Sequence, residues 1–508
     1  MHKRVWSHPW PFVAASVAVF LALAFFRREV LFYPPYWDSV VGLFPEAIWL
    51  RDNGFDYLKL AYAEPGYGHG GARNLFFTVY PAFQALLLKV FPPQFFLLFN
   101  HLWTFGLAAL SLTLFYRLLA RTNRAAVAFA GSALLFAHPL FLSQADAINY
   151  ELAVLAVSLL AIDRTLSGRA MAGAGLAALA ACIKPTGVIV AFALFLFQLI
   201  TIGLSKSKGQ SDGAPSRKDT FWPLTILIAI GAAAIGQWFL RETLYREASD
   251  TIVVFLRGSI KREVLDSPEL SVLFTIAALF MVGVAWRFWH PRTGASRMAP
   301  SDLMACLFVF SFLCFYVNII PMLPRYFFYC LPFLLYGLIR LIDQAINAPF
   351  FTAAILLILS GLVFSNRTGQ FYTPITTRDG FLLERSLEYV EDMRLNLSLA
   401  KRLEDHYAGV AIITSPPYAQ MLALPELGYV TRPLAAVTRS GPLRYGGLAY
   451  REAVRAAVGD TVWLYGPNCF SSHYAYNPQE DRVIETFGEG PRQITLFTNI
   501  EYEKKAIP

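Results

Sequence analysis

The sequence predicts a polytopic α-helical membrane protein with a small α/β domain at its C-terminal end. Of its 508 residues, 56% are hydrophobic and only 15% are charged, whereas a soluble domain carries about 25% charged residues. Apolar runs close to the ~20 residues needed to cross a bilayer recur along the first two thirds of the chain. Such runs must be helical, because hydrocarbon offers their backbone groups no hydrogen-bond partner.

We expect about eleven crossings. The expected segments are 10–26, 95–117, 126–142, 147–163, 170–183, 187–204, 221–240, 270–286, 301–319, 326–341 and 349–365. The run 75–91 is assigned to the outer leaflet, as a re-entrant or interfacial helix, because a crossing there would invert every later loop. The alternative for the first segment is a signal peptide, since Ala22-Leu23-Ala24 has the form of a cleavage site. Its apolar run is longer than a usual signal core, which favours a retained helix.

The basic residues of the loops set the orientation. With eleven crossings, the Lys and Arg residues at 3–4, 117–124, 164–169, 206–218 and 287–297 fall in cytoplasmic loops, as the positive-inside rule requires. The N-terminus is then cytoplasmic, the C-terminal domain is extracytoplasmic, and the protein is expected in the inner (plasma) membrane. The basic residues form no dense tract, so the net charge of +8 does not indicate nucleic-acid binding.

Two domains follow from the change in composition near Ser365. Residues 1–365 form the membrane domain, with external loops at 27–94 and 241–268. Residues 366–508 form the extracytoplasmic α/β domain. Helices are expected at 386–407 and 450–458, and strands at 409–414, 461–465 and 493–497. This domain contains no Gly-rich phosphate loop and no nucleophile elbow.

Polar residues gather at the expected outer ends of the spans. They include Asn100, His101, His138, Asp146, Asn149, Glu151, Lys184, Asn318 and Arg325. Ionisable groups are costly in a membrane and indicate function when they converge, so a site that opens outward is predicted. The alternative is that helix ends are polar only because they meet the interface.

The external loops add further candidates. The first contains Asp38 and, in a Gly-rich stretch, Glu64 and His69. The second carries five cations, namely Arg241, Arg246, Arg257, Lys261 and Arg262. Lipid-linked phosphate is one explanation for cations on this side of the membrane. An amphipathic helix resting on anionic headgroups is the other.

In their order along the chain, these features resemble the GT-C glycosyltransferases, in particular relatives of the protein O-mannosyltransferases and of the lipid A aminoarabinose transferase. The matching features over residues 1–345 are Asp38 after the first span, Tyr80-Pro81, Asp146, the Lys184 to Gly187 stretch and Arg325-Tyr326. The resemblance implies transfer of a sugar from a polyprenyl-phosphate donor to a lipid, glycan or protein acceptor at the outer face. Ser39 stands where many relatives carry a second acidic residue, and one carboxylate is a poor site for a hard cation. No metal or other cofactor is therefore expected.

The residues suit that chemistry. Asp38 is the expected general base, with a helix N-cap as its alternative role, and Asp146 would assist it or hold the acceptor. Binding of the donor phosphate is assigned to Arg257, Lys261, Arg262, Arg325 and Lys184, and binding of substrate to Glu64, His69 and His101. Two other functions stay open: a transporter or flippase of lipid-linked saccharides, and a non-catalytic envelope protein whose external domain binds a partner.

Overall fold

The computed structural model describes residues 9–57, 79–207, 221–233, 268–289, 299–316, 324–370, 385–414, 416–438, 461–465, 481–489 and 493–499. These residues divide into two compact units. Unit 1 takes the described residues of 1–26, 104–145 and 150–372, and unit 2 takes those of 27–103, 146–149 and 373–508. The expected membrane domain included the loop 27–94, whereas the described part of that loop belongs to unit 2, with the C-terminal segment.

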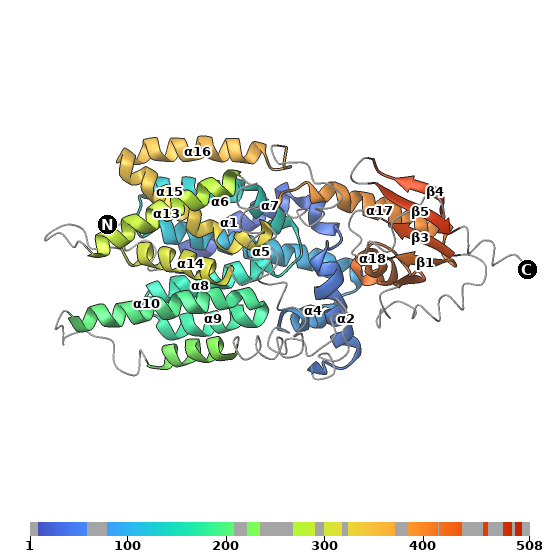
Figure 1. Cartoon of the computed structure of the whole chain (residues 1–508), viewed down its shortest axis with the longest axis horizontal. Helices are drawn as coiled ribbons and strands as arrows, with labels where there is room; N and C mark the ends of the chain where they lie inside the picture. Colours follow the sequence, from blue (N-terminus) through green and yellow to red (C-terminus); the bar gives the residue numbers. More distant parts are fainter. Residues whose placement is uncertain are drawn as a thin grey trace, which may run out of the picture. The chain divides into compact units, whose positions relative to one another are not determined.

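Unit 1 is helical (Figure 1). Its elements are α1 (Pro9–Phe26), the larger part of α5 (Pro93–Ala120), α6 (Ala125–Ala137), most of α7 (Pro139–Asp146), α8 (Glu151–Leu166), α9 (Ala170–Ile183), η4 (Pro185–Gly187), α10 (Val188–Ser207), a helix at Phe221–Ala233, α13 (Pro268–Trp289), α14 (Pro300–Tyr316), η6 (Pro324–Tyr329), α15 (Leu331–Ile346) and α16 (Pro349–Ser365). Every expected crossing therefore overlaps described helix, although residues 234–240 and 317–319, at the ends of two of them, lie outside the described residues.

Fewer described helices than the eleven expected crossings are both long enough and apolar enough to span a membrane. Among the described residues, Phe95–Ala120 and Pro185–Gly203 are long and apolar enough to cross a membrane. The pair α6 and α7 makes a third if the two helices form one span. The other apolar helices are shorter, so the number of crossings stays a prediction.

The expected span 126–142 is broken. Helix α6 ends at Ala137, α7 begins at Pro139, and their axes differ by 66°. Proline has no amide hydrogen to continue the helix, and it forces the preceding residue out of the α region. His138 accordingly has extended backbone angles, φ −67° and ψ 128°. The break redirects the chain toward Asp146 at the end of α7.

Small residues allow close packing of the helices in unit 1. Helix α9 is rich in Ala and Gly and packs along α8, while α10 packs against α9 and α14 (Figure 1). A Cβ atom at Gly173 would lie 2.0 Å from Thr165 Oγ1, so only glycine fits at this point of the contact. Close backbone approach of this kind is how helices associate in lipid.

Unit 2 combines the described first-loop residues with the C-terminal segment. Its N-terminal elements are η1 (Arg28–Phe32), a π-helical turn η2 (Ser39–Leu43), α2 (Phe44–Asp52), α4 (Val79–Val90) and the first part of α5. Helix α4, expected to be interfacial, packs on α2. Its 12 residues span about 18 Å, less than the ~30 Å hydrocarbon thickness.

The C-terminal segment forms a mixed sheet with helices. Its elements are α17 (Tyr389–His406), β1 (Ala411–Thr414), α18 (Tyr418–Ala423), η8 (Pro425–Leu427), β2 (Ala436–Thr438), β3 (Thr461–Tyr465), β4 (Asp481–Phe487) and β5 (Ile494–Asn499). The strand order is β2-β1-β3-β5-β4. Strand β1 pairs in parallel with β2 and β3, and β5 pairs antiparallel with β3 and β4. The helix at 386–407 and the three expected strands are confirmed, β2 and β4 were not predicted, and the helix expected at 450–458 lies outside the described residues.

Candidate functional site

The backbone at Asp38 is unusual. Trp37, directly before it, has φ 39°, in the left-handed region that bulky residues rarely adopt. The π-helical turn Ser39–Leu43 follows Asp38 at once, and π turns occur frequently at functional sites. Every residue from Pro34 to Pro45 is buried except Asp38, which is half-buried. The turn therefore presents one carboxylate from an otherwise buried segment.

The alternative role of Asp38 as a helix cap has no support in this geometry. A capping residue has extended backbone angles and accepts a hydrogen bond from the first helical turn. Asp38 has helical angles, φ −56° and ψ −32°, and makes no side-chain capping hydrogen bond. Its position needs another explanation.

Asp146 lies in the same unit as Asp38 and is held by Arg27, which was not among the predicted site residues. Arg27 Nε lies 3.2 Å from Asp146 Oδ1, and Arg27 Nη2 pairs with Asp146 Oδ2. Arg27 also pairs with Glu29 at 3.0 Å. The Asp146 carboxylate is buried, with 2% of its side chain exposed. Both its oxygens are engaged by the guanidinium, which suits a group that holds the site together rather than one that takes a proton.

The segments carrying Asp38 and Asp146 are joined directly. The Ser39 hydroxyl donates a hydrogen bond to the Ile148 carbonyl. His101 of α5, buried, has Nε2 2.9 Å from the Tyr33 carbonyl oxygen and lies beside the backbone carbonyl of Asp146. His101 was predicted to bind substrate; the contacts that the structure shows for it are with backbone.

Lys184 and Arg325 belong to unit 1. The Lys184 ammonium pairs with the buried Glu151 carboxylate at the start of α8 and lies 5.7 Å from the centre of the Tyr150 ring. Gly187 closes the turn after Lys184: a Cβ there would lie 2.2 Å from the Ala180 carbonyl, so no larger residue fits. Arg325 is buried in η6, which also packs on α8.

The remaining candidates lie outside the described residues. They are Arg257, Lys261 and Arg262 of the basic external loop and Glu64 and His69 of the first loop. Within the ranges that the structure describes, no group of three or more His, Cys, Asp or Glu side chains could hold a metal ion.

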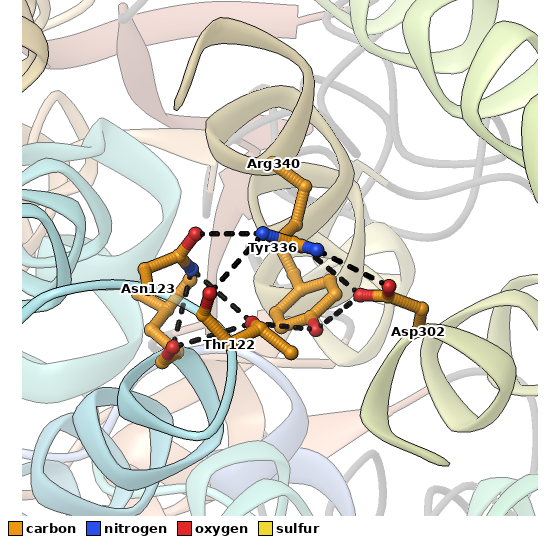
Figure 2. Close-up of polar contacts among 6 residues, drawn as sticks. Thr122, Asn123, Asp302, Tyr336 and Arg340 are labelled. Carbon is orange, nitrogen blue, oxygen red and sulfur yellow. Dashed lines mark hydrogen bonds and ion pairs between the residues drawn. The ribbon is translucent and has the colours of Figure 1, made fainter. Parts of the chain in front are cut away.

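Two charged networks in unit 1 were not predicted as clusters. In the first, Asp302 of α14 accepts hydrogen bonds from Tyr336 at 2.6 Å and from Arg340 Nε at 3.1 Å (Figure 2). Arg340 also donates to Asn123 Oδ1 at 3.1 Å, and Thr122 lies 3.0 Å from the Tyr336 hydroxyl. The network therefore joins α14 and α15 to the turn after α5.

In the second network, Asp163 accepts from Arg121 at 3.0 Å and lies 3.4 Å from Arg117. The sequence signal for both networks was an ionisable residue at an expected cytoplasmic helix end. In each network a buried carboxylate of one helix pairs with arginine from another part of unit 1, so both networks join helices.

The chain has a mostly helical fold like that of ArnT, and two or three of its described helices are long and apolar enough to cross a membrane. A crystal structure of ArnT from Cupriavidus metallidurans in the apo state matches 96% of this chain and 99% of its own, with a TM-score of 0.51 and 12% sequence identity. At that identity the likeness shows the fold alone. No protein-family profile and no curated protein sequence matches the chain.

Two further crystal structures are similar at lower scores. ArnT from the same organism, bound to undecaprenyl phosphate, matches 96% of this chain and 97% of its own, with a TM-score of 0.48 and 14% identity. The apo oligosaccharyltransferase of Archaeoglobus fulgidus matches 84% of this chain and 64% of its own, with a TM-score of 0.37 and 11% identity.

Proposed function

We propose that the protein is a membrane glycosyltransferase that moves a sugar from a polyprenyl-phosphate-linked donor to a lipid, glycan or protein acceptor on the extracytoplasmic face. The observation that carries this proposal is the Asp38 turn. A half-buried carboxylate, not used as a helix cap, stands on a buried segment at the position that the GT-C resemblance assigns to the base. The ArnT fold supports it, and ArnT itself has been crystallised with undecaprenyl phosphate.

The reaction is a displacement at the anomeric carbon. The acceptor hydroxyl attacks that carbon, its proton passes to the Asp38 carboxylate, and the bond from the anomeric carbon to the phosphate oxygen breaks with its electron pair leaving on the polyprenyl phosphate. A positioned base contributes ~10² to 10⁴ in rate, and cations stabilise the departing phosphate. Arg325, Lys184, Arg257, Lys261 and Arg262 are the proposed phosphate-binding residues, and Glu64, His69 and His101 remain proposed for substrate.

Asp146 is proposed as a positioning residue. It is buried and bound on both oxygens by Arg27. Through the Ser39 to Ile148 hydrogen bond, the 146–148 segment holds the turn that begins at Asp38. Asp146 therefore supports the base without contacting the reacting atoms.

The test is transfer of a radiolabelled sugar from its polyprenyl phosphate by the purified full-length protein in nanodiscs, with an envelope extract as acceptor. Wild-type protein should form a labelled product, and Asp38→Asn should lower kcat by ~10² to 10⁴ while the thermal midpoint stays unchanged. Asp405→Asn, an exposed position on α17, is the matched control. Full activity of Asp38→Asn would remove Asp38 from the mechanism.

A flippase of lipid-linked saccharides is the second candidate. The broken helix pair at His138 favours it, because transporters use discontinuous helices at their binding sites. The two functions differ in product: a flippase moves the labelled lipid between leaflets and leaves its sugar–phosphate bond intact. Recovery of only the intact donor, now in the opposite leaflet, would support the flippase and contradict the transferase.

A further inference from the structure

Within unit 2, the C-terminal segment holds the residues that lead into Asp38. The Tyr429 hydroxyl donates a buried hydrogen bond of 2.8 Å to the Pro35 carbonyl oxygen. The Tyr36 ring packs on the Tyr389 ring of α17, with 5.3 Å between ring centres. These contacts fix the backbone two and three residues before Asp38.

A third contact holds the start of the same segment. Arg394 of α17 donates to the Tyr33 hydroxyl at 2.9 Å, and its guanidinium carbon lies 5.9 Å from the centre of the Tyr33 ring. This pair is partly exposed, so it contributes less than the buried Tyr429 hydrogen bond.

The C-terminal segment also holds the chain beyond Asp38. Arg51 of α2 pairs with Glu426 of η8 at 2.9 Å. Next to that pair, Gly428 packs so closely on α5 that a Cβ atom would lie 2.7 Å from Leu97 Cδ1. Gly428 also has φ +80°, which disfavours any side chain at that position. The turn at Asp38 is thus held both before and after it by the same part of the chain.

The turn requires such support. The backbone conformation of Trp37, with φ 39°, costs on the order of 1–3 kcal/mol. Such a conformation persists only where surrounding contacts hold it in place. Local hydrogen bonds, from Ser39 N to Tyr36 O at 3.1 Å and from Val40 N to Trp37 O at 2.9 Å, close the turn but do not select its strained form. The Tyr429 to Pro35 bond and the Tyr36 to Tyr389 contact supply restraint from outside the turn.

We propose that the C-terminal domain positions the catalytic carboxylate, with Tyr429 as the main positioning residue. Its hydroxyl fixes the Pro35 carbonyl, which holds Trp37 in its left-handed conformation and so sets the direction of Asp38. This assignment rests on the proposed transferase function and gives the extracytoplasmic domain a part in the reaction. Tyr429 contacts no substrate and acts only through the 35–38 backbone.

Tyr429→Phe tests this proposal, because it removes one hydroxyl and keeps the buried ring. A shift of about 1 Å in a reacting group can cost ~10²-fold in rate, so kcat should fall at least about tenfold while the donor KM stays within about twofold. Tyr407→Phe, at the residue that caps the C-terminal end of α17, should behave as wild type. A general loss of folding would instead lower the amount of active protein and the thermal midpoint.

Hydrogen exchange of the full-length protein gives a second readout that needs no activity. In Tyr429→Phe the amides of Ser39 and Val40 should exchange faster than in wild type, and in Tyr407→Phe they should not. If Asp38→Asn abolishes transfer but Tyr429→Phe leaves both kcat and exchange unchanged, this inference is overturned and the proposed function stands. If wild-type protein transfers no sugar, the proposed function fails, and the positioning role in catalysis fails with it. Faster exchange would then support only the restraint of the turn by Tyr429.

Discussion

The Arg27 guanidinium binds the Asp146 carboxylate through two nitrogens, so the residue that follows α1 is fixed to the last residue of α7. Only 2% of the Asp146 side chain is exposed, against 24% for Arg27. This difference in exposure decides the effect of a substitution. Removing Arg27 leaves the more deeply buried carboxylate without a compensating charge, which destabilises the folded state.

Arg27→Met should therefore destabilise the protein by about 3 kcal/mol or more, since it leaves a buried carboxylate without its cation. The double variant Arg27→Met with Asp146→Leu should recover most of that loss, because an apolar pair of similar size fills the same space. Thermal unfolding in detergent measures both, and Arg51→Met, whose ion pairs are more exposed, serves as the control. Equal midpoints for the single and double variants would contradict a coupled pair.

We expect the main role of Lys184 to be its ion pair with Glu151, and donor binding can be tested separately as a second role. Its ammonium pairs with a carboxylate that is 1% exposed, so Lys184→Met should lower stability by a few kcal/mol. Lys184→Met with Glu151→Gln should restore it. If Lys184 also binds donor phosphate, the donor KM stays raised in the double variant, whereas a return of KM to the wild-type value would assign Lys184 to structure alone.

Asp392 of α17 should make the stability depend on pH. Burial, followed by the negative charge of Glu388, raises the pKa of the Asp392 carboxyl from 3.8 to about 7. Between these two values the folded state holds a proton that the unfolded state has released. Stability from this group is therefore complete below about pH 3.8 and is lost as the pH rises to about 7.

Asp392→Asn removes this titration and keeps the size of the side chain. The variant should be more stable than wild type at pH 8, and the difference between the two should shrink toward pH 5. Thermal midpoints of the two full-length proteins at several pH values decide the matter. Because all other groups titrate in both proteins, parallel curves would show that Asp392 does not hold its proton in the folded state.

The orientation of the chain is tested from outside the cell. Eleven crossings from a cytoplasmic N-terminus put residues 366–508 on the extracytoplasmic side. A cysteine at Ser472, introduced in a Cys469→Ser background, should react in intact spheroplasts with a thiol reagent that cannot cross the membrane. Labelling only by a membrane-permeant reagent would contradict this orientation and place the domain in the cytoplasm. The same background without the new cysteine gives the blank.

Much of the fold follows from patterns that are local in the sequence. Apolar runs must become helices wherever water is absent, and each expected crossing overlaps described helix. The strands at 411–414 and 461–465 were equally visible, because a short buried apolar run bounded by polar residues has few other solutions. The break at His138 could also have been found, since Pro139 marks it.

The sequence alone determined that the chain is mostly helical with a small C-terminal sheet, where most of the described helices lie, and which residue types are available at the helix ends. Only the tertiary structure decided which of these residues meet. That Arg27 binds Asp146, that Lys184 binds Glu151, and that Tyr429 holds Pro35 are contacts between positions far apart in the chain. No periodic pattern in the sequence predicts these contacts, because side-chain partners are selected by packing and by the need to match every buried charge and hydrogen-bonding group.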